Sequence, residues 1–189
     1  MHPLNSRTAA IAAVAILAPA VAGCGINAIP TKEEAARARW ADVQSAYQRR
    51  ADLVPQLVAT VKGYAGHEHA LLEAVTELRT QALAQTAPAR LGAIEGSLES
   101  ALGKLVVLAE SYPELKASGN FLQLQRDLVE VEEHLQYARR FYNGAVRDSN
   151  NATERFPGLL VARGFGFDPA EFFETDAQSR AAVAGEVAP

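Results

Sequence analysis

The sequence predicts an all-α protein, an elongated antiparallel bundle of four main helices. Apolar residues recur at alternating spacings of three and four over long stretches, which is the pattern of a helix face packed against other helices. No stretch combines period-2 alternation with the Gly-Asn turns of a β-hairpin. Short connections join the helical stretches, and helices joined in this way pack as antiparallel neighbours.

The first helical seam covers residues 40–64, and only Arg50 interrupts its apolar character. Pro55 lies inside this seam. Because proline lacks a backbone N–H and its ring clashes with the preceding turn, we expect a kink near residues 51–52. The seam positions are Trp40, Val43, Tyr47, Arg50, Val54, Leu57, Val61 and Tyr64.

Two shorter helical stretches follow a weak point at Gly63. The first carries an apolar stripe over residues 71–82 and is ended by Pro88. The second covers residues 91–108 and ends before Pro113. Proline directly after an apolar-periodic stretch is a typical end signal for a helix.

The last seam is the longest, and Asn120 before it and Pro157 after it predict its N-cap and its end. At 1.5 Å per residue, this helix would be about 50 Å long. Its positions are Phe121, Leu124, Leu128, Val131, Leu135, Ala138, Tyr142, Ala145, Ser149, Ala152 and Phe156.

The N-terminal residues have the composition of a secretory signal peptide. Arg7 precedes an apolar run over residues 8–22, which is shorter than the roughly 20 residues of a spanning helix. The run closes with Val21-Ala22-Gly23-Cys24, which resembles the bacterial lipobox. This resemblance implies cleavage before Cys24 and acyl chains such as palmitate on its thiol. Several acyl chains at one point hold a soluble domain stably on a bilayer.

A retained membrane anchor that happens to contain a cysteine is the alternative, because the apolar stretch can be extended through residues 25–29. Pro19 disfavours a continuous helix, and the only cysteine falls at the lipobox position. Gly25 stands where a retention signal would place Asp. We therefore expect an exported lipoprotein on the outer membrane, facing the periplasm, or on the outer face of the cytoplasmic membrane in a host with one membrane.

Four segments make up the expected domain organisation. Residues 1–23 are the signal peptide, residues 24–30 a short tether, residues 31–157 the helical bundle and residues 158–189 a C-terminal tail. A capping box from Thr31 to Glu34 predicts the start of the first helix. The tail should dock its aromatic part on the bundle and end in disorder.

The composition and motifs argue against an enzyme, a metalloprotein and a nucleic-acid-binding protein. A net charge of −4 provides no basic surface for nucleic acid. His67 and His69 point to opposite sides of a helix and cannot share a metal ion. No nucleophile elbow or phosphate-binding loop is found, so no catalytic residue and no cofactor is expected. The acidic pairs Glu33-Glu34 and Glu132-Glu133 are interpreted as solvated helix faces.

A few polar residues near the seams are candidate interhelical or binding residues. Buried polar groups must be paired, and such pairs can fix the register of helices. We favour this structural role over a ligand or catalytic site around Arg50, Glu110 and Arg140. A sizeable pocket where an unpaired Arg50 and Tyr64 converge would reverse this preference. The candidates are Arg50, Asp52, Glu68, Glu110, Arg140 and Asn143.

Several motifs together resemble the LemA family, over about residues 33–167. The resemblance implies a helical bundle exposed outside the cytoplasmic membrane, and it carries no established activity. Family members usually have an N-terminal transmembrane helix, whereas this sequence has a lipobox-like segment in that place. Ser149, in the last seam, is a second departure, because relatives tend to have an apolar or aromatic residue there. The motifs lie in residues 48–58, 60–65, 67–68, 110–116, 120–125, 138–143 and 156–157.

We therefore expect a lipid-anchored envelope protein that acts as a non-enzymatic interaction or scaffold module. Its expected partners are the membrane, through the anchor on Cys24, and other envelope proteins. A small-ligand-binding module, or an enzyme with a site between helices, is the alternative.

Overall fold

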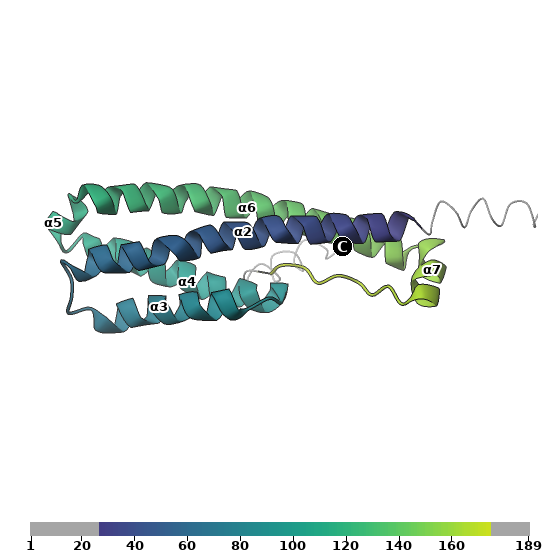
Figure 1. The fold of residues 1–189 in the computed structure, drawn as a ribbon, viewed down its shortest axis with the longest axis horizontal. Helices are drawn as coiled ribbons and strands as arrows, with labels where there is room; N and C mark the ends of the chain where they lie inside the picture. The colour runs from purple at the N-terminus through teal and green to yellow at the C-terminus, as the bar shows by residue number, and fades with distance from the viewer. Residues whose placement is uncertain (1–26, 175–189) are drawn as a thin grey trace, which may run out of the picture. The chain divides into compact units, whose positions relative to one another are not determined.

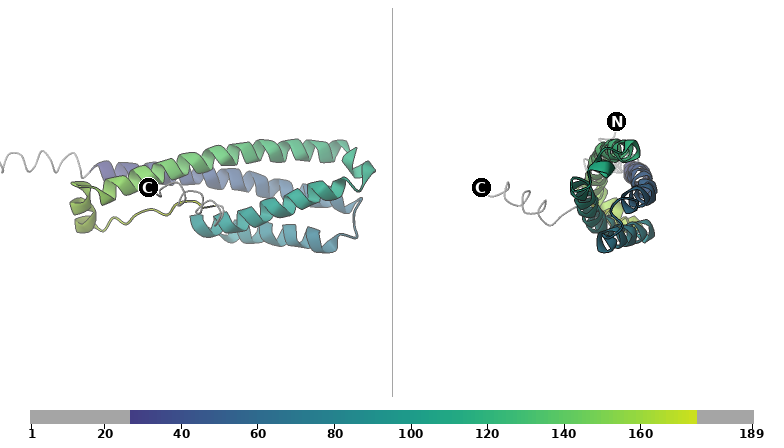
Figure 2. Two further views of the ribbon diagram at one scale, coloured as in Figure 1. Left: turned by 180° about the vertical axis from the view of Figure 1, so that it is seen from behind. Right: turned by 90° about the vertical axis from the view of Figure 1, so that its left-hand side faces the viewer.

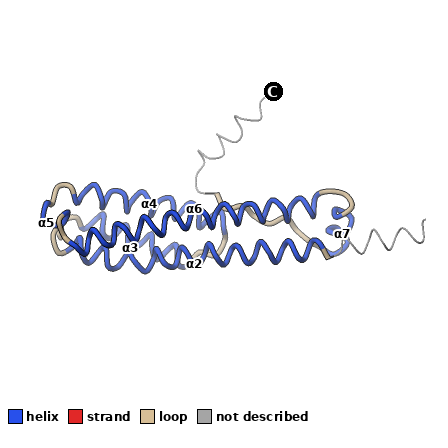
Figure 3. Tube along the Cα trace, turned by 90° about the horizontal axis from the view of Figure 1, so that it is seen from above, coloured by secondary structure: helices blue, strands red, loops and turns tan. Residues whose placement is uncertain are grey.

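The computed structural model describes residues 27–174, and these residues form helices joined by loops, with no strand (Figure 3). The all-α prediction is therefore confirmed. Residues 1–26, which include Cys24 and the predicted signal peptide, and residues 175–189 lie outside the described part. The helices are α2 (Ala28–Lys62), α3 (His69–Ala84), α4 (Pro88–Ala109), α5 (Pro113–Lys116), α6 (Gly119–Glu154) and α7 (Gly158–Phe165).

The described chain divides into two compact units, residues 39–143 with 171–174 and residues 27–38 with 144–170. The larger unit contains α3, α4, α5 and most of α2 and α6. Its four long helical segments surround a common core, as the end-on view of Figure 2 shows and Figure 1 shows from the side. The helix stripes predicted from the sequence supply this core. The fully buried members include Val54, Leu57, Val61, Val75, Leu98, Leu105, Leu115 and Phe121.

The first seam is buried from Val43 to Val61, as its spacing predicts. Tyr64 departs from the pattern, because α2 ends at Lys62 and the tyrosine side chain is 44% exposed. Arg50 is buried with the apolar members of the seam and is only 3% exposed. The seam therefore carries a charged group into the interior of the larger unit.

Pro55 lies within α2, and the helix continues through it. A proline at this position leaves the carbonyl of Ala51, four residues earlier, without its helical N–H partner. Arg79 of α3 supplies the missing donor, with its Nε 2.6 Å from the Ala51 oxygen. An uninterrupted helix at this buried site thus depends on a side chain from the neighbouring helix.

Two predicted helix starts are wrong by a few residues. Helix α2 begins at Ala28, so Thr31 is helical and its hydroxyl donates to the carbonyl of Asn27 instead of capping the helix. Residues 28–30, which belong to the predicted tether, are therefore helical. Pro30 fits because N–H groups in the first turn of a helix need no helical partner. Asn120 is the second residue of α6 and not its N-cap.

The smaller unit contains α7, where the sequence predicted only a tail. Gly158 begins α7 and allows a close approach, because a Cβ there would lie 2.0 Å from the carbonyl oxygen of Ala152. Ala162 of α7 and Val146 of α6 are both buried in this unit. A short glycine-containing helix gives little periodic signal, which is why the sequence did not reveal it.

In the second half of the long seam, Ser149 is buried as predicted, but two other positions differ by one residue. Val146 and Thr153 are buried where the strict spacing predicted Ala145 and Ala152. A straight α-helix has 3.6 residues per turn, so its inward face drifts away from a strict alternation of three and four. Phe156, the last predicted position, follows the end of α6 and is 79% exposed.

Candidate functional site

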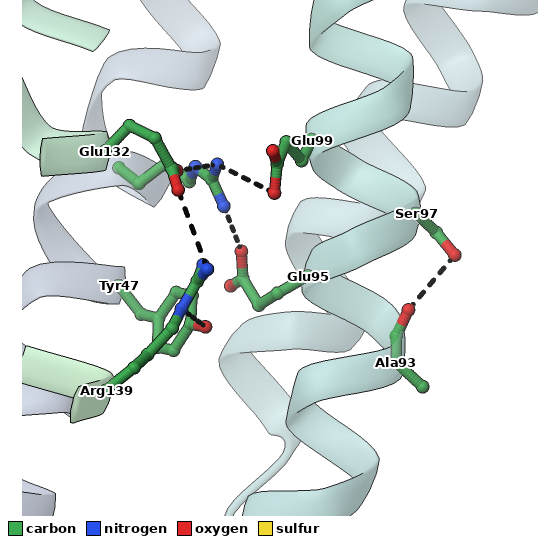
Figure 4. Close-up of polar contacts among 8 residues, drawn as sticks. Tyr47, Ala93, Glu95, Ser97, Glu99, Glu132 and Arg139 are labelled. Atoms are coloured by element: carbon green, nitrogen blue, oxygen red, sulfur yellow. Dashed lines mark hydrogen bonds and ion pairs between the residues drawn. The ribbon is translucent and has the colours of Figure 1, made fainter. Parts of the chain in front are cut away.

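A buried cluster of charged residues lies at the middle of the larger unit, where α2, α4 and α6 meet (Figure 4). Arg50 of α2 donates from Nη1 to Glu95 of α4 at 2.9 Å and from Nη2 to Glu132 of α6 at 2.5 Å. Glu99 lies one turn further along α4, 4.0 Å from Nη2. The guanidinium thus connects three helices, and both of its terminal nitrogens are occupied.

Glu132 connects this arginine to a second one on its own helix. Its Oε1 lies 3.6 Å from Nη1 of Arg139, and the Nε of Arg139 donates to the hydroxyl of Tyr47 at 2.9 Å. In Figure 4, Glu95, Glu99, Glu132 and Arg139 point toward one another from α4 and α6. We call Tyr47, Arg50, Glu95, Glu99, Glu132 and Arg139 the arginine cluster.

Burial dominates the electrostatics of the arginine cluster. Removal from water raises the pKa of Glu95 above its usual range, although the positive charges of Arg50 and Arg139 lower it. Burial likewise raises the pKa of the Tyr47 hydroxyl, against the opposing effect of Arg139. Desolvation by burial is the main cause of both shifts.

Arg139 is also enclosed by aromatic rings. Its guanidinium carbon lies 5.4 Å from the ring centre of Tyr47 and 5.5 Å from that of Phe173. Its Nη2 atom is buried without a hydrogen-bond partner among the described residues. Attraction to the two ring faces offsets part of the lost hydration of this nitrogen.

Phe173 is held in place by Asn143 of α6. The Asn143 side chain donates to the carbonyl of Phe173 at 3.0 Å and accepts from its N–H at 2.9 Å. The ring packs against Trp40 and Tyr47, with centroid distances of 6.3 and 5.8 Å. Gly92 of α4 makes room for this segment, because a Cβ there would lie 2.0 Å from the carbonyl oxygen of Glu174.

The structure does not bring the other predicted site residues to Arg50. Asp52 is exposed and accepts a hydrogen bond from Gln48 one turn earlier. Glu68 precedes α3 and Glu110 follows α4, each as a helix-end residue. Arg140 is exposed, and its guanidinium lies 4.7 Å from the ring centre of Tyr137. Among the described residues, Arg50 and Asn143 are the two of the six candidates whose side chains form hydrogen bonds to a distant segment of the chain.

Glu95, Glu132 and Arg139 were not among the six candidate residues predicted from the sequence. The interpretation of Glu132 as part of a solvated face is wrong, because it is half-buried and paired with Arg50. A signal for Glu95 did exist. It lies four residues after Leu91 and three before Leu98, which is a seam position. A carboxylate buried at such a position needs a cation to pair with, and another helix can supply it.

A groove of about 640 Å³ lies beside the arginine cluster, between α4 and α6. Its apolar wall includes Leu102, Val106, Leu122 and Val129, and its other lining residues include Arg50 and four glutamates. Tyr64 does not line it. We call this feature the α4–α6 groove. Its lining residues are Arg50, Glu99, Leu102, Gly103, Val106, Leu122, Gln125, Arg126, Leu128, Val129, Glu130, Glu132 and Glu133.

The arginine cluster is suited to holding helices together and not to activating a substrate. A catalytic group needs a free atom directed at a reacting molecule, whereas Arg50 and Glu95 are directed at each other in the interior. Within residues 27–174, no group of three or more His, Cys, Asp or Glu side chains is placed to hold a metal ion. None of the described helices has a stretch long and apolar enough to cross a bilayer.

Comparison with known proteins gives one family match and several distant relatives. The LemA family model matches residues 39–186. Magnetosome protein MamQ 2 of Paramagnetospirillum magneticum is 26% identical over 175 residues, which cover 78% of this chain and 64% of that protein. MamQ of Magnetospirillum gryphiswaldense is 24% identical with the same coverage. Protein LemA of Metamycoplasma hominis is 26% identical over 125 residues, 64% of this chain and 56% of that protein.

Proposed function

This chain belongs to the LemA family, and we propose that it serves as a membrane-attached, non-enzymatic helical module that binds other proteins of the cell envelope. One observation carries the non-enzymatic part of this proposal. The most deeply buried charged groups, Arg50 and Glu95, satisfy each other across two helices. A pair used in this way fixes the register of the bundle and leaves no activated group for chemistry.

Attachment to the membrane is assigned to Cys24. The sequence Val21-Ala22-Gly23-Cys24 resembles a lipobox, and the preceding 15-residue apolar run resembles that of a signal peptide. Acylation at Cys24 would place residues 27–174 close to the membrane surface without a spanning helix. The matched segment spans about two thirds of the MamQ relatives, so we transfer no whole-protein activity from them.

The experiment for attachment is mass spectrometry of the mature N-terminal peptide, together with fractionation of a Cys24→Ser variant. We expect an acylated Cys24 at the new N-terminus. The variant should accumulate as uncleaved precursor. Recovery of an unmodified chain that starts at Met1 from wild-type membranes would contradict a lipid anchor and favour the retained-anchor alternative.

The experiment for protein binding is proximity labelling from the attached protein. A labelling enzyme fused to the C-terminus should mark a small, reproducible set of envelope proteins. The same fusion on a lipobox signal without residues 31–174 controls for proteins that are merely close to the membrane. Identical labelled sets from the two fusions would contradict a specific interaction module.

A small-ligand site between helices is the second candidate, and the α4–α6 groove next to Arg50 is the observation that favours it. The geometry argues against an anionic ligand at Arg50, because Glu95 and Glu132 already occupy its terminal nitrogens. Glu110 and Arg140, the other members of the predicted ligand site, do not line the groove. The paired state of Arg50 therefore favours the interaction module.

A further inference from the structure

The α4–α6 groove combines an apolar wall with an acidic end. Val106, Leu122 and Val129 are 37%, 39% and 60% exposed, so large aliphatic side chains line it while open to solvent. Exposed apolar surface rimmed by charged residues is typical of sites where proteins bind. Apart from Arg50 of α2, the residues that line the groove come from α4 and α6.

The charges on the lining are unevenly distributed along the groove. Glu99, Glu130, Glu132 and Glu133 lie at the end nearest Arg50, whereas Arg126 lies toward the end near Leu122. Arg50 is already shared between Glu95 and Glu132. Glu130 and Glu133 are exposed and form no ion pair among the described residues. Arg49 lines a neighbouring pocket together with them but forms no hydrogen bond or ion pair with either. Glu130 and Glu133 therefore add negative charge to this end that no ion pair among the described residues balances.

The length of the groove suits a helix of a few turns. The lining covers residues 99–106 of α4 and residues 122–133 of α6, which correspond to about 10 and 16 Å along the two helices. A helix laid into this channel would contact it over about three turns. Its apolar face, repeated at spacings of three and four, would meet the leucine and valine wall, and basic residues at one end would meet the glutamates.

We propose that the α4–α6 groove binds an amphipathic helix of a partner protein, with the partner's Lys or Arg residues at the end that faces Glu99, Glu130 and Glu133. This inference deepens the proposed function, because it identifies the surface and the chemistry of the partner. The glutamates of the groove also argue against an anionic membrane as the occupant, since like charges repel.

The test uses the full chain in phosphatidylcholine nanodiscs and a fluorescent peptide of about 14 residues, designed as a helix with a leucine face and lysines at its N-terminal end. Fluorescence anisotropy measures binding, and empty nanodiscs give the background. A peptide with glutamates in place of the lysines is the matched probe. We expect the lysine peptide to bind at least about 5-fold more tightly than the glutamate peptide.

Variants of the protein locate the binding surface. Val129→Asp should weaken binding of the lysine peptide about 10-fold or more, because it places a charge on the apolar wall. Val107→Asp is the matched control: Val107 is 66% exposed on α4 but does not line the groove, so binding should stay within about 2-fold. Glu133→Lys should reverse the preference in favour of the glutamate peptide, whereas Glu114→Lys on α5 should not.

Several results would overturn the inference. They are equal binding of both peptides, equal loss in the Val129→Asp and Val107→Asp variants, and no binding at all. Binding only to a chain shortened after Glu174 would show that its own C-terminal segment occupies the groove. A dimer that Val129→Asp dissociates would show that a second copy does. Repeating the measurement with Cys24→Ser protein in detergent separates this test from that of the lipid anchor.

Discussion

The Nε of Arg79 lies 2.6 Å from the carbonyl oxygen of Ala51, the one carbonyl of α2 that Pro55 deprives of its helical partner. Ala51 is 2% exposed, so water cannot take the place of the missing N–H. An arginine on α3 therefore makes a proline tolerable inside α2. The contact also fixes α3 against α2 at a defined register.

Loss of this donor should destabilise the larger unit. We expect Arg79→Leu to lower the free energy of unfolding by about 1–3 kcal/mol, because a buried carbonyl loses its hydrogen bond. Urea unfolding followed by circular dichroism measures the change. In the Pro55→Ala background the same substitution should cost less, since alanine restores the helical N–H. Equal costs in the two backgrounds would show that Arg79 acts independently of Pro55.

Removal of Arg50 alone from the arginine cluster should lower the free energy of unfolding. Arg50→Met leaves Glu95 and Glu132 without their shared cation, and we expect a loss of about 3–5 kcal/mol in chemical denaturation. The double variant Arg50→Met/Glu95→Leu should recover part of this loss, because it removes the orphaned buried carboxyl. Arg49→Met, one residue away and exposed, is the matched control and should change stability by less than about 0.5 kcal/mol. A double variant less stable than Arg50→Met would contradict a mainly electrostatic cost.

Glu95 should contribute a pH dependence of a definite sign. Its pKa is raised in the folded state, so between the usual value of 4.5 and the raised value the folded chain holds a proton that the unfolded chain releases. The contribution of Glu95 to stability therefore falls as pH rises through this interval. Relative to the Glu95→Gln variant, the wild type should therefore lose free energy of unfolding as pH rises through this interval. Glu99→Gln, which changes the exposed glutamate one turn further along α4, is the control. A difference between the wild type and Glu95→Gln that does not depend on pH would contradict the raised pKa.

Gly92 should be essential for the placement of the segment that carries Phe173. A Cβ at position 92 would meet the carbonyl oxygen of Glu174, so Gly92→Ala should displace the segment at a cost of about 1–3 kcal/mol. Trp40 is the only tryptophan and its ring lies 6.3 Å from Phe173, so its fluorescence should shift to longer wavelength. Gly144→Ala, with open space around the added methyl group, should leave the spectrum unchanged. Identical spectra for both variants would argue against the close approach.

The sequence predicted the fold well where a long amphipathic pattern determines the structure. The first seam is buried from Val43 to Val61, and the last is buried at Phe121, Leu124 and Leu135. Failures occurred where a short or drifting pattern decides the outcome. Helix α7 has only eight residues, and α6 buries Val146 and Thr153 in place of the predicted Ala145 and Ala152. Periodicity over several turns averages out such local detail.

The site was less predictable, because its contacts join residues far apart in the chain. Arg50 stood out as a charge inside a seam, but its partner Glu95 is 45 residues away. For Arg139 a signal was present, because it lies four residues after Leu135 and three before Tyr142, which places it on the inward side of the helix. Successive helical residues differ by about 100° in direction, so Arg139 enters the cluster while Arg140 remains exposed. Donors such as Arg79 become apparent only once the packing of helices is known.

Binding of an envelope partner in the α4–α6 groove is tested most directly by photo-crosslinking in living cells. A benzophenone amino acid is placed at position 129 or at position 107. Both residues are exposed, but only Val129 lines the α4–α6 groove. We expect a discrete adduct with an envelope protein from position 129, none from position 107, and loss of the adduct when Cys24 is changed to Ser. Equal adducts from both positions, or an adduct that persists in the Cys24→Ser variant, would contradict a membrane-attached module that binds its partner through this groove.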